Sequence, residues 1–146
     1  MKKIFSIVLA VALATSIYAQ AAVTVPQNVQ DAFRSKYPNV TGVTWSEEQG
    51  YYKPSFSVGG AQTTAFIDLK GRLIQTITKI SDEALPGAAA GYIKQNYSNA
   101  PVGDAGRIDF VVPAHASRFY AVVNGQTLVF DNKGEFVKVS TSPLKQ

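Results

Sequence analysis

Two stretches of the chain share one pattern of hydrophobic and polar positions. Residues 66–74 (FIDLKGRLI) and residues 129–137 (VFDNKGEFV) each contain an apolar run, an Asp-x-Lys-Gly break and a second apolar run. Aspartate favours the start of a tight turn, where its side chain accepts from the backbone, and glycine tolerates the positive φ near its end. The pattern therefore predicts two antiparallel hairpins of similar design.

A helical pattern precedes each hairpin. Residues 26–37 carry apolar side chains at three- and four-residue spacing, and residues 86–97 repeat that pattern sixty positions later. This spacing lines one face of a helix. A proline opens each segment, where its missing N–H has no helical partner to lose. The matched apolar positions are Val29, Ala32, Phe33 and Tyr37 in the first segment and Ala89, Tyr92, Ile93 and Tyr97 in the second.

The remaining apolar segments predict strands. Alternation and β-branched residues indicate strands, and Asn124-Gly125 is a strong signal for a two-residue hairpin turn. Pro54 cannot donate to a ladder, so its strand is expected at an edge or with a bulge. The predicted strands are residues 40–45, 51–58 and 61–68 in the first half and residues 107–112, 118–123, 127–131 and 135–140 in the second.

These elements predict an α+β fold made of a tandem repeat, in which each copy is one helix followed by a four-stranded antiparallel sheet. The copies are expected at residues 22–80 and 81–146, packed together as one domain because the connection between them is short and lacks linker composition. A helix on one face of a sheet leaves the other face open to partners.

The N-terminus has the form of a secretory signal peptide. Two lysines precede a fourteen-residue apolar run at residues 4–17, and Ala19-Gln20-Ala21 follows. We expect cleavage after Ala21, with Ala19 as the alternative. The run is too short for a spanning helix, so the mature protein is expected to be periplasmic or secreted, without stable membrane insertion.

Charge and cysteine content narrow the classes of partner. Without Lys2 and Lys3, twelve basic residues face ten acidic ones, and the net charge falls from +4 to +2. This mild, scattered charge argues against binding to nucleic acid. The chain has no cysteine, so its stability has to come from buried apolar area without disulfides.

No residue cluster predicts a catalytic or metal site. The chain lacks a thiol nucleophile, has the single histidine His115, and has no glycine loop of the phosphate-binding kind. A hydrolase that uses His115 is a minor alternative, and turn formation is the preferred role for Asp68 and Asp131 over calcium binding. The sequence therefore predicts no cofactor and no enzymatic activity.

Aromatic residues are the class that most suggests binding. Alternation along the strands places about half of them against the helices, and those on the opposite face would supply binding hot spots. Trp45 and Tyr51 are the first candidates for a binding surface, and Lys53 and Phe119 complete the predicted set.

Several of these motifs resemble a known family. Val25-Pro26, Tyr37-Pro38, Val43-x-Trp45, Phe66-x-Asp68-x-x-Gly71 and Asp131-x-x-Gly134 are similar to the PepSY-like, or β-lactamase-inhibitor-like, exported proteins of bacteria. The resemblance covers nearly the whole mature chain. It implies the inhibitor-type fold, in which a concave antiparallel sheet grips a partner protein, and a non-catalytic role.

We therefore expect an exported, non-catalytic binding protein that docks an extracytoplasmic protein on its sheet face. One form of this function is inhibition of an extracytoplasmic enzyme. The alternative is a periplasmic small-ligand-binding protein, with aromatic residues lining a groove between the two halves.

Overall fold

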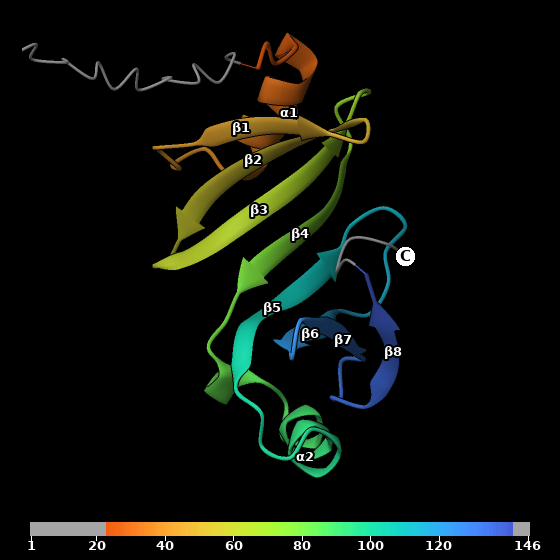
Figure 1. Ribbon diagram of the computed structural model, residues 1–146. Helices are drawn as coiled ribbons and strands as arrows, with labels where there is room; N and C mark the ends of the chain where they lie inside the picture. The colour runs from red at the N-terminus through yellow and green to blue at the C-terminus, as the bar shows by residue number, and fades with distance from the viewer. Residues whose placement is uncertain (1–22, 142–146) are drawn as a thin grey trace, which may run out of the picture.

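The computed structural model describes residues 23–141. The predicted signal peptide and residues 142–146 lie outside this range. Figure 1 shows the two α-helices at opposite ends of the molecule with the strands between them. In chain order the elements are α1 (Gln27–Lys36), β1 (Thr44–Glu48), β2 (Tyr51–Val58), β3 (Ala61–Asp68), β4 (Leu73–Lys79), the 3₁₀ helix η1 (Asp82–Ala84), α2 (Gly87–Asn96), β5 (Val102–Phe110), β6 (Arg118–Val123), β7 (Gln126–Phe130) and β8 (Phe136–Ser140).

The predicted fold class was wrong. The structure is mostly β, with one continuous eight-stranded antiparallel sheet in the order β1 to β8, rather than a tandem α+β repeat with two four-stranded sheets. The two halves merge because β4 pairs directly with β5, from Gln75 opposite Phe110 to Lys79 opposite Gly106. Pairing at this junction satisfies backbone groups that two separate sheets would leave open at their edges.

Both predicted α-helices are present at nearly the predicted positions. Pro26 and Pro86 precede them, and in each helix the backbone N–H of the closing tyrosine, Tyr37 or Tyr97, still bonds within the last turn. Among the described residues, no helix has the length and apolar composition needed to cross a membrane.

Some strand boundaries differ from the prediction. Strand β1 runs to Glu48, because Gln49 and Gly50 form a tight turn with φ values of 52° and 81°. Strand β5 starts at Val102 rather than at residue 107, although Gly103 and Gly106 disfavour a strand. Its pairing with β6 overrides that local preference.

Proline 54 lies in β2, which has partners on both sides and is not an edge strand. The β2–β3 ladder keeps its register but lacks paired positions at Lys53 and Pro54, between Tyr52 opposite Ile67 and Ser55 opposite Thr64. The missing proline N–H is accommodated by this gap, so the predicted edge position or bulge was wrong.

Both helices cover the same face of the sheet. Under α1, Val29 and Phe33 pack with inward-facing residues of β2 and β3, and under α2, Ala89 and Ile93 pack with residues of β5, β6 and β7. Directly opposite residues of neighbouring strands point to the same face of a sheet. Ala65 is opposite Thr76, and Thr76 is opposite Asp109, so the helix-covered face continues from β3 through β4 to β5. Between the two apolar clusters the helix-covered face is polar, with Thr63 bonded to Thr78 at 3.3 Å.

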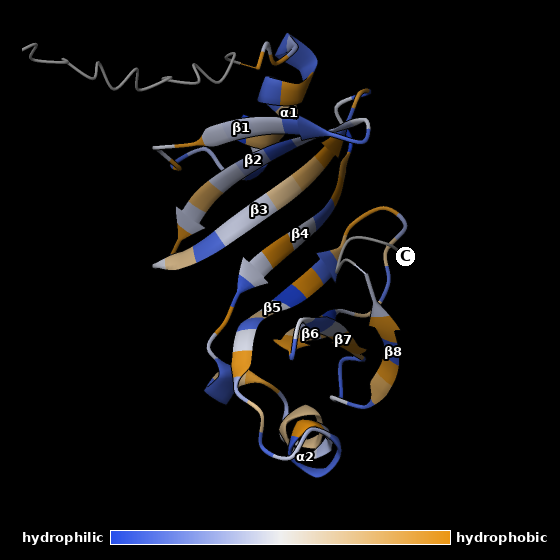
Figure 2. Ribbon diagram, in the orientation of Figure 1, coloured by the Kyte–Doolittle hydropathy of each residue, from blue (hydrophilic) through white to orange (hydrophobic). Residues whose placement is uncertain are grey.

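A third apolar cluster lies on the opposite face, at the junction of the two halves. We call it the junction cluster; its buried members are Phe66, Ile77, Ile108 and Tyr120, and Phe110 and Val122 pack against it. Figure 2 shows hydrophobic and hydrophilic residues alternating along β4 and β5, as expected for strands whose two faces differ in environment. Ile77 and Ile108 are directly opposite each other in the β4–β5 pair.

Tyr120 fills the end of this cluster by lying against a glycine. A Cβ atom on Gly106, its partner across β5 and β6, would overlap the Tyr120 ring. The Tyr120 hydroxyl donates to Asp104 Oδ2 at 3.2 Å, and Lys79 Nζ lies 3.2 Å from Asp104 Oδ1. Burial, assisted by the Asp104 charge, raises the pKa of Tyr120, so the phenol stays protonated and remains a donor.

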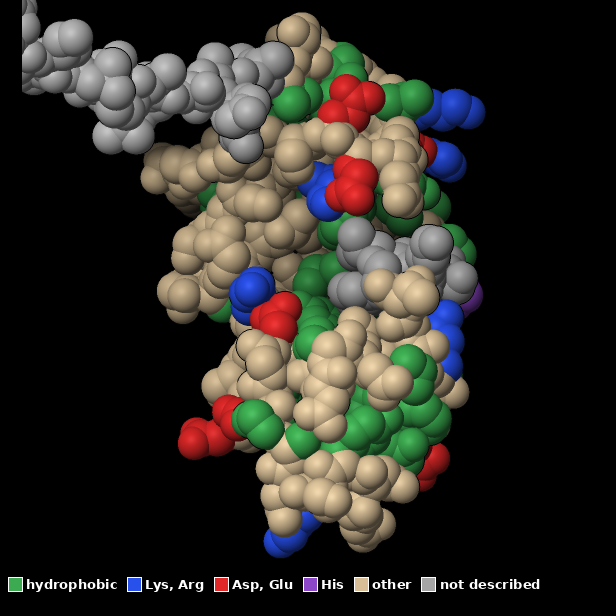
Figure 3. Space-filling view, viewed as in Figure 1, with side chains coloured by type: hydrophobic (Ala, Val, Ile, Leu, Met, Phe, Trp, Pro, Cys, Tyr) green, Lys and Arg blue, Asp and Glu red, His purple; other side chains and the backbone are tan. Residues whose placement is uncertain are grey.

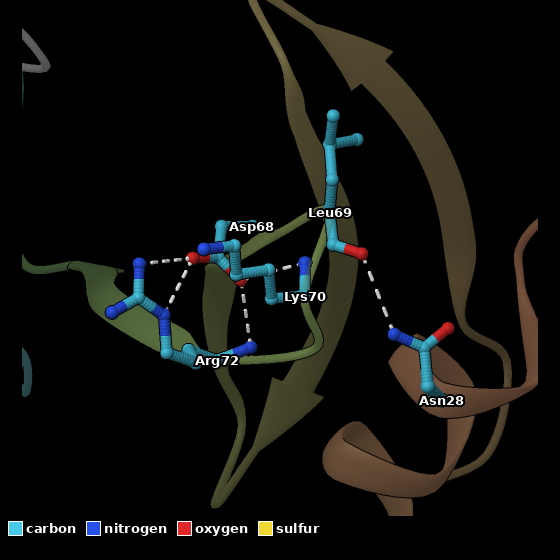
Figure 4. A network of polar contacts seen from close by, with 5 residues as sticks. All are labelled: Asn28, Asp68, Leu69, Lys70 and Arg72. Atoms are coloured by element: carbon cyan, nitrogen blue, oxygen red, sulfur yellow. Dashed lines mark hydrogen bonds and ion pairs between the residues drawn. The ribbon is translucent and has the colours of Figure 1, made fainter.

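The two Asp-x-Lys-Gly turns fasten the strands to the helices. Asp68 Oδ1 accepts from the backbone N–H groups of Lys70 (3.0 Å) and Arg72 (2.9 Å), and Asn28 Nδ2 of α1 donates to the Leu69 carbonyl at 3.4 Å (Figure 4). Gly71 has a φ of 79°, and a Cβ there would lie 2.9 Å from the Asn28 carbonyl oxygen. A glycine is therefore needed here because other residues disfavour the positive φ and because a side chain would overlap the α1 backbone.

The second turn is built in the same way. Asp131 Oδ1 accepts from the backbone N–H groups of Lys133 (2.8 Å) and Glu135 (2.9 Å). Gly134 has a φ of 88°, and a Cβ there would lie 2.9 Å from the Ala89 nitrogen of α2. In each half, the recurring sequence pattern corresponds to a hairpin whose turn packs on the N-terminus of a helix.

We predict that Gly106→Ala destabilises the protein by about 1–3 kcal/mol, because the added methyl group forces the Tyr120 ring out of the junction cluster. Urea unfolding measures this change. Gly103→Ala is the matched control in the same strand, since the nearest heavy atom to its Cβ would be 3.8 Å away. Equal stabilities of the two variants would contradict the packing role of Gly106.

We also predict that the two turn aspartates make stability fall in acid. Hydrogen bonding from the Glu135 amide is the main influence that lowers the pKa of Asp131. At Asp68, desolvation acts to raise the pKa, but the hydrogen bonds and charge of Arg72, with the Lys70 amide, outweigh it and lower the pKa. Carboxyls with a depressed folded pKa stabilise above the unfolded value, about 3.9, and this contribution is lost as the pH falls through the folded pKa.

The measurement is the melting temperature between about pH 5 and pH 2. The double variant Asp68→Asn, Asp131→Asn keeps an acceptor oxygen at each turn but cannot titrate, so its melting temperature should fall less over this range than that of the wild type. Parallel curves for the two proteins would show that the turn carboxylates do not contribute to acid sensitivity.

Candidate functional site

A row of aromatic and polar side chains crosses the face of the sheet opposite α1 and α2. Phe66 on β3 is opposite Gln75 on β4, which is in turn opposite Phe110 on β5. Neighbouring side chains on β2 and β6 extend the row to both sides. We call this set the aromatic–basic row; its members are Tyr51, Lys53, Phe66, Gln75, Phe110 and Arg118.

One end of the row is a cation placed over an aromatic ring. Lys53 Nζ lies 5.4 Å from the centre of the Phe66 ring, and the Tyr51 ring meets Phe66 edge to face at 6.4 Å. Glu48 forms an ion pair with Lys53 and holds its ammonium group in this position. Phe66 is 6% exposed although no helix covers it, because these long side chains shield it.

The other end repeats this chemistry with different residues. The Arg118 guanidinium carbon lies 5.6 Å from the centre of the Phe110 ring. His115 meets the same ring edge to face at 6.1 Å. Cation–aromatic contacts of this kind keep an apolar ring and a charge together at the surface, which suits recognition of a partner.

The junction cluster lies on the same face and shares Phe66 with the row. Figure 3 shows hydrophobic side chains in the middle of the molecule, with one adjacent pair of basic and acidic side chains above them and another to their left. The ion pair of Lys79 with Asp104 lies at the edge of the junction cluster, where Asp104 also accepts from the Tyr120 hydroxyl.

A cavity of about 420 Å³ opens beside the first end of the row. Apolar atoms of Tyr51, Phe66, Ile74, Val112 and Pro113 line it, together with the polar residues Glu48, Gln49, Lys53 and Gln75. Its walls come from both halves of the chain, since Val112 and Pro113 belong to the loop between β5 and β6. A volume of this size is within the range of small-molecule sites.

Backbone hydrogen bonds fix the loop that forms one wall of this cavity. The N–H groups of Val111 and Val112 both donate to the Ile74 carbonyl, at 2.8 Å and 3.1 Å. These bonds extend the β4–β5 contact past the end of β5, so the cavity is a preformed feature of the junction.

Two further hollows lie elsewhere. One of about 520 Å³ lies near the second end of the row and is lined by Phe110, His115 and Arg118 among others. Another of about 290 Å³ lies at the C-terminal end of α1, where Phe33, Tyr37 and Trp45 contribute. Neither contains a deeply buried polar side chain.

The structure divides the predicted site residues between the two faces. Tyr51 and Lys53 lie together in the aromatic–basic row. Trp45 lies on the helix-covered face, where its ring meets Phe33 edge to face at 5.4 Å, and Phe119 packs beside the cluster under α2. The four residues therefore do not form one surface.

Sequence reasoning missed Gln75, Phe110 and Arg118. Alternation along each strand gives the spacing of these residues, but it does not say which face of β4 continues onto which face of β5. The register between these strands brings Gln75 next to Phe110, and no local sequence signal encodes it.

The geometry around His115 differs from that of a Ser-His-Asp relay. The nearby hydroxyl of Ser117 donates to Asp109 Oδ1 at 2.6 Å, while His115 contacts the Phe110 ring. Within residues 23–141, no three acidic, histidine or cysteine side chains cluster in a way that suits a metal ion.

Solved structures with the same architecture come from species of Bacteroides. A DUF2874 family protein from Bacteroides uniformis superimposes with a TM-score of 0.74 at 23% identity, covering 80% of this chain and 89% of that one. A BLIP-like protein from Bacteroides fragilis gives a TM-score of 0.68 at 22% identity, covering 82% and 88%. The chain has the β-lactamase-inhibitor-like fold.

A candidate periplasmic protein from Bacteroides eggerthii also has this fold, with a TM-score of 0.74 at 21% identity over 81% of this chain and 89% of its own. No protein-family model and no curated protein sequence matches the chain. At these identities the likeness concerns the fold, so function has to be argued from the surface of this chain itself.

Proposed function

We propose that the mature chain is an exported, non-catalytic binding protein that docks a partner protein on the helix-free face of its sheet. The observation that carries this proposal is the pair of cation–aromatic contacts, Lys53 over Phe66 and Arg118 over Phe110, beside the junction cluster. Aromatic and arginine side chains around an apolar centre are the usual composition of binding hot spots.

Export is supported by the signal-peptide pattern of residues 1–21 and by the shared fold with a candidate periplasmic protein. The fold is also that of a BLIP-like protein. This shared fold, together with the PepSY-like motifs, supports an extracytoplasmic enzyme as the class of partner. The sheet face would bind this enzyme without catalysing a reaction on it.

A second candidate function is small-ligand binding. The cavity of about 420 Å³ between the β1–β2 turn and the β5–β6 loop favours it, since the cavity is lined from both halves of the chain. The two candidates are compatible, because the cavity opens beside one end of the aromatic–basic row.

We predict that reversing the charges in the row weakens binding of the partner. The double variant Lys53→Glu, Arg118→Glu should lower the affinity for a captured extracytoplasmic protein at least about tenfold, as expected when hot-spot contacts are removed. The measurement is cross-linking in the native periplasm followed by mass spectrometry, and then titration with the purified partner.

The matched control is Lys36→Glu, Lys94→Glu, which makes the same change in net charge on exposed positions of the two helices. It should bind as the wild type does. An equal loss of affinity in both double variants would show that net charge alone is responsible. Unchanged affinity in both would show that the partner binds elsewhere on the molecule.

A further inference from the structure

One buried polar side chain in the lining of the cavity beside Tyr51 has no hydrogen-bond partner in the described structure. Gln75 is 5% exposed and lines the cavity. Its side-chain amide takes part in none of the side-chain hydrogen bonds within residues 23–141. A buried amide normally has partners, because leaving it without them costs free energy.

We infer that the amide of Gln75 faces the cavity. No fully buried side-chain nitrogen or oxygen in the described part of the chain lacks a partner. The unbonded amide atoms of Gln75 are therefore the small part of this residue that remains accessible, and the space available to them is the cavity that the residue lines. An amide presents both a donor and an acceptor to whatever occupies that space.

The other walls select against a charged ligand. The single cation of the lining, Lys53, already carries an ion pair with Glu48, so the lining has no net formal charge. The remaining contacts are largely apolar and aromatic, including the edge-to-face pair of Tyr51 and Phe66. A charged group placed here would lose hydration without gaining a counter-ion.

We propose that this cavity binds a neutral group that combines an amide with an apolar or aromatic body, the amide pairing with Gln75 and the body packing against Tyr51, Phe66 and Val112. A peptide unit beside an aromatic side chain has this chemistry, whether it belongs to a free small molecule or to a segment of a larger chain. The inference rests on the ligand-binding candidate function stated above and names the class of ligand.

The test is titration of ¹⁵N-labelled protein with three probes, followed by NMR. The probes are N-acetyl-phenylalaninamide, which is neutral and has amides; N-acetyl-phenylalanine, whose carboxylate is charged; and p-cresol, which has no amide. The Gln75 side-chain NH₂ signals are identified by their loss in Gln75→Met. We expect N-acetyl-phenylalaninamide to shift these signals in a saturable way and to bind more tightly than the other two probes.

Gln75→Met should weaken binding of N-acetyl-phenylalaninamide at least about fivefold, as expected for the loss of one net hydrogen bond. It should leave the melting temperature unchanged or raised, because the amide has no protein partner to lose. Gln62 is an exposed residue of β3 and lies on the sheet face that also carries Gln75. Gln62→Met is therefore the control and should bind N-acetyl-phenylalaninamide as the wild type does. A large fall in melting temperature for Gln75→Met would assign the amide a structural role and overturn the proposal.

The outcomes separate the inference from the function on which it rests. Binding of p-cresol alone, or equal binding by wild type and Gln75→Met, overturns the amide assignment and keeps ligand binding. Binding of N-acetyl-phenylalanine alone overturns the preference for a neutral ligand and likewise keeps ligand binding. If no probe shifts the Gln75 signals, both the amide assignment and the ligand-binding function are overturned. A neutral peptide of seven residues with a central phenylalanine distinguishes the two sources: tighter binding than the small amide indicates a segment of a larger chain, and weaker binding indicates a free small molecule, both in support of the amide site.

Discussion

The pairing of β4 with β5 is the interaction on which the rest of the structure depends. Five residue pairs join the halves, from Gln75 opposite Phe110 to Lys79 opposite Gly106. The chain between these strands contains η1 and α2, so the pairing closes a long loop. The entropic cost of closing this loop has to be offset by the burial of apolar side chains. Ile77 and Ile108 face each other at its centre, which is why the junction cluster forms on the face that no helix covers.

This arrangement separates the tasks of the two faces. On one face, α1 and α2 each bury an apolar cluster, and the strip between them is polar. On the other face, apolar burial is concentrated at the junction, and long side chains such as Lys53 and Arg118 shield its rings. Under the proposed function, a partner protein would meet these long side chains and the rings beneath them.

The same junction creates the cavity. The Ile74 carbonyl holds the β5–β6 loop through Val111 and Val112, and this brings Val112 and Pro113 near residues of β2 and β3. Gln75, one position further along β4, is thereby enclosed in the lining of the cavity. The cavity is a consequence of joining the two halves, since neither half alone provides all the walls.

The sequence by itself determined the local elements. The spacing of Val29 and Phe33 and of Ala89 and Ile93 predicted both α-helices, and Asp68 with Gly71 predicted a hairpin, because these patterns act over a few residues. Only the tertiary structure decided that the strands form one sheet, that Trp45 and Phe119 face the helices, and that Gln75 meets Phe110. The physical reason is that register between distant strands depends on long-range burial, which no short segment specifies.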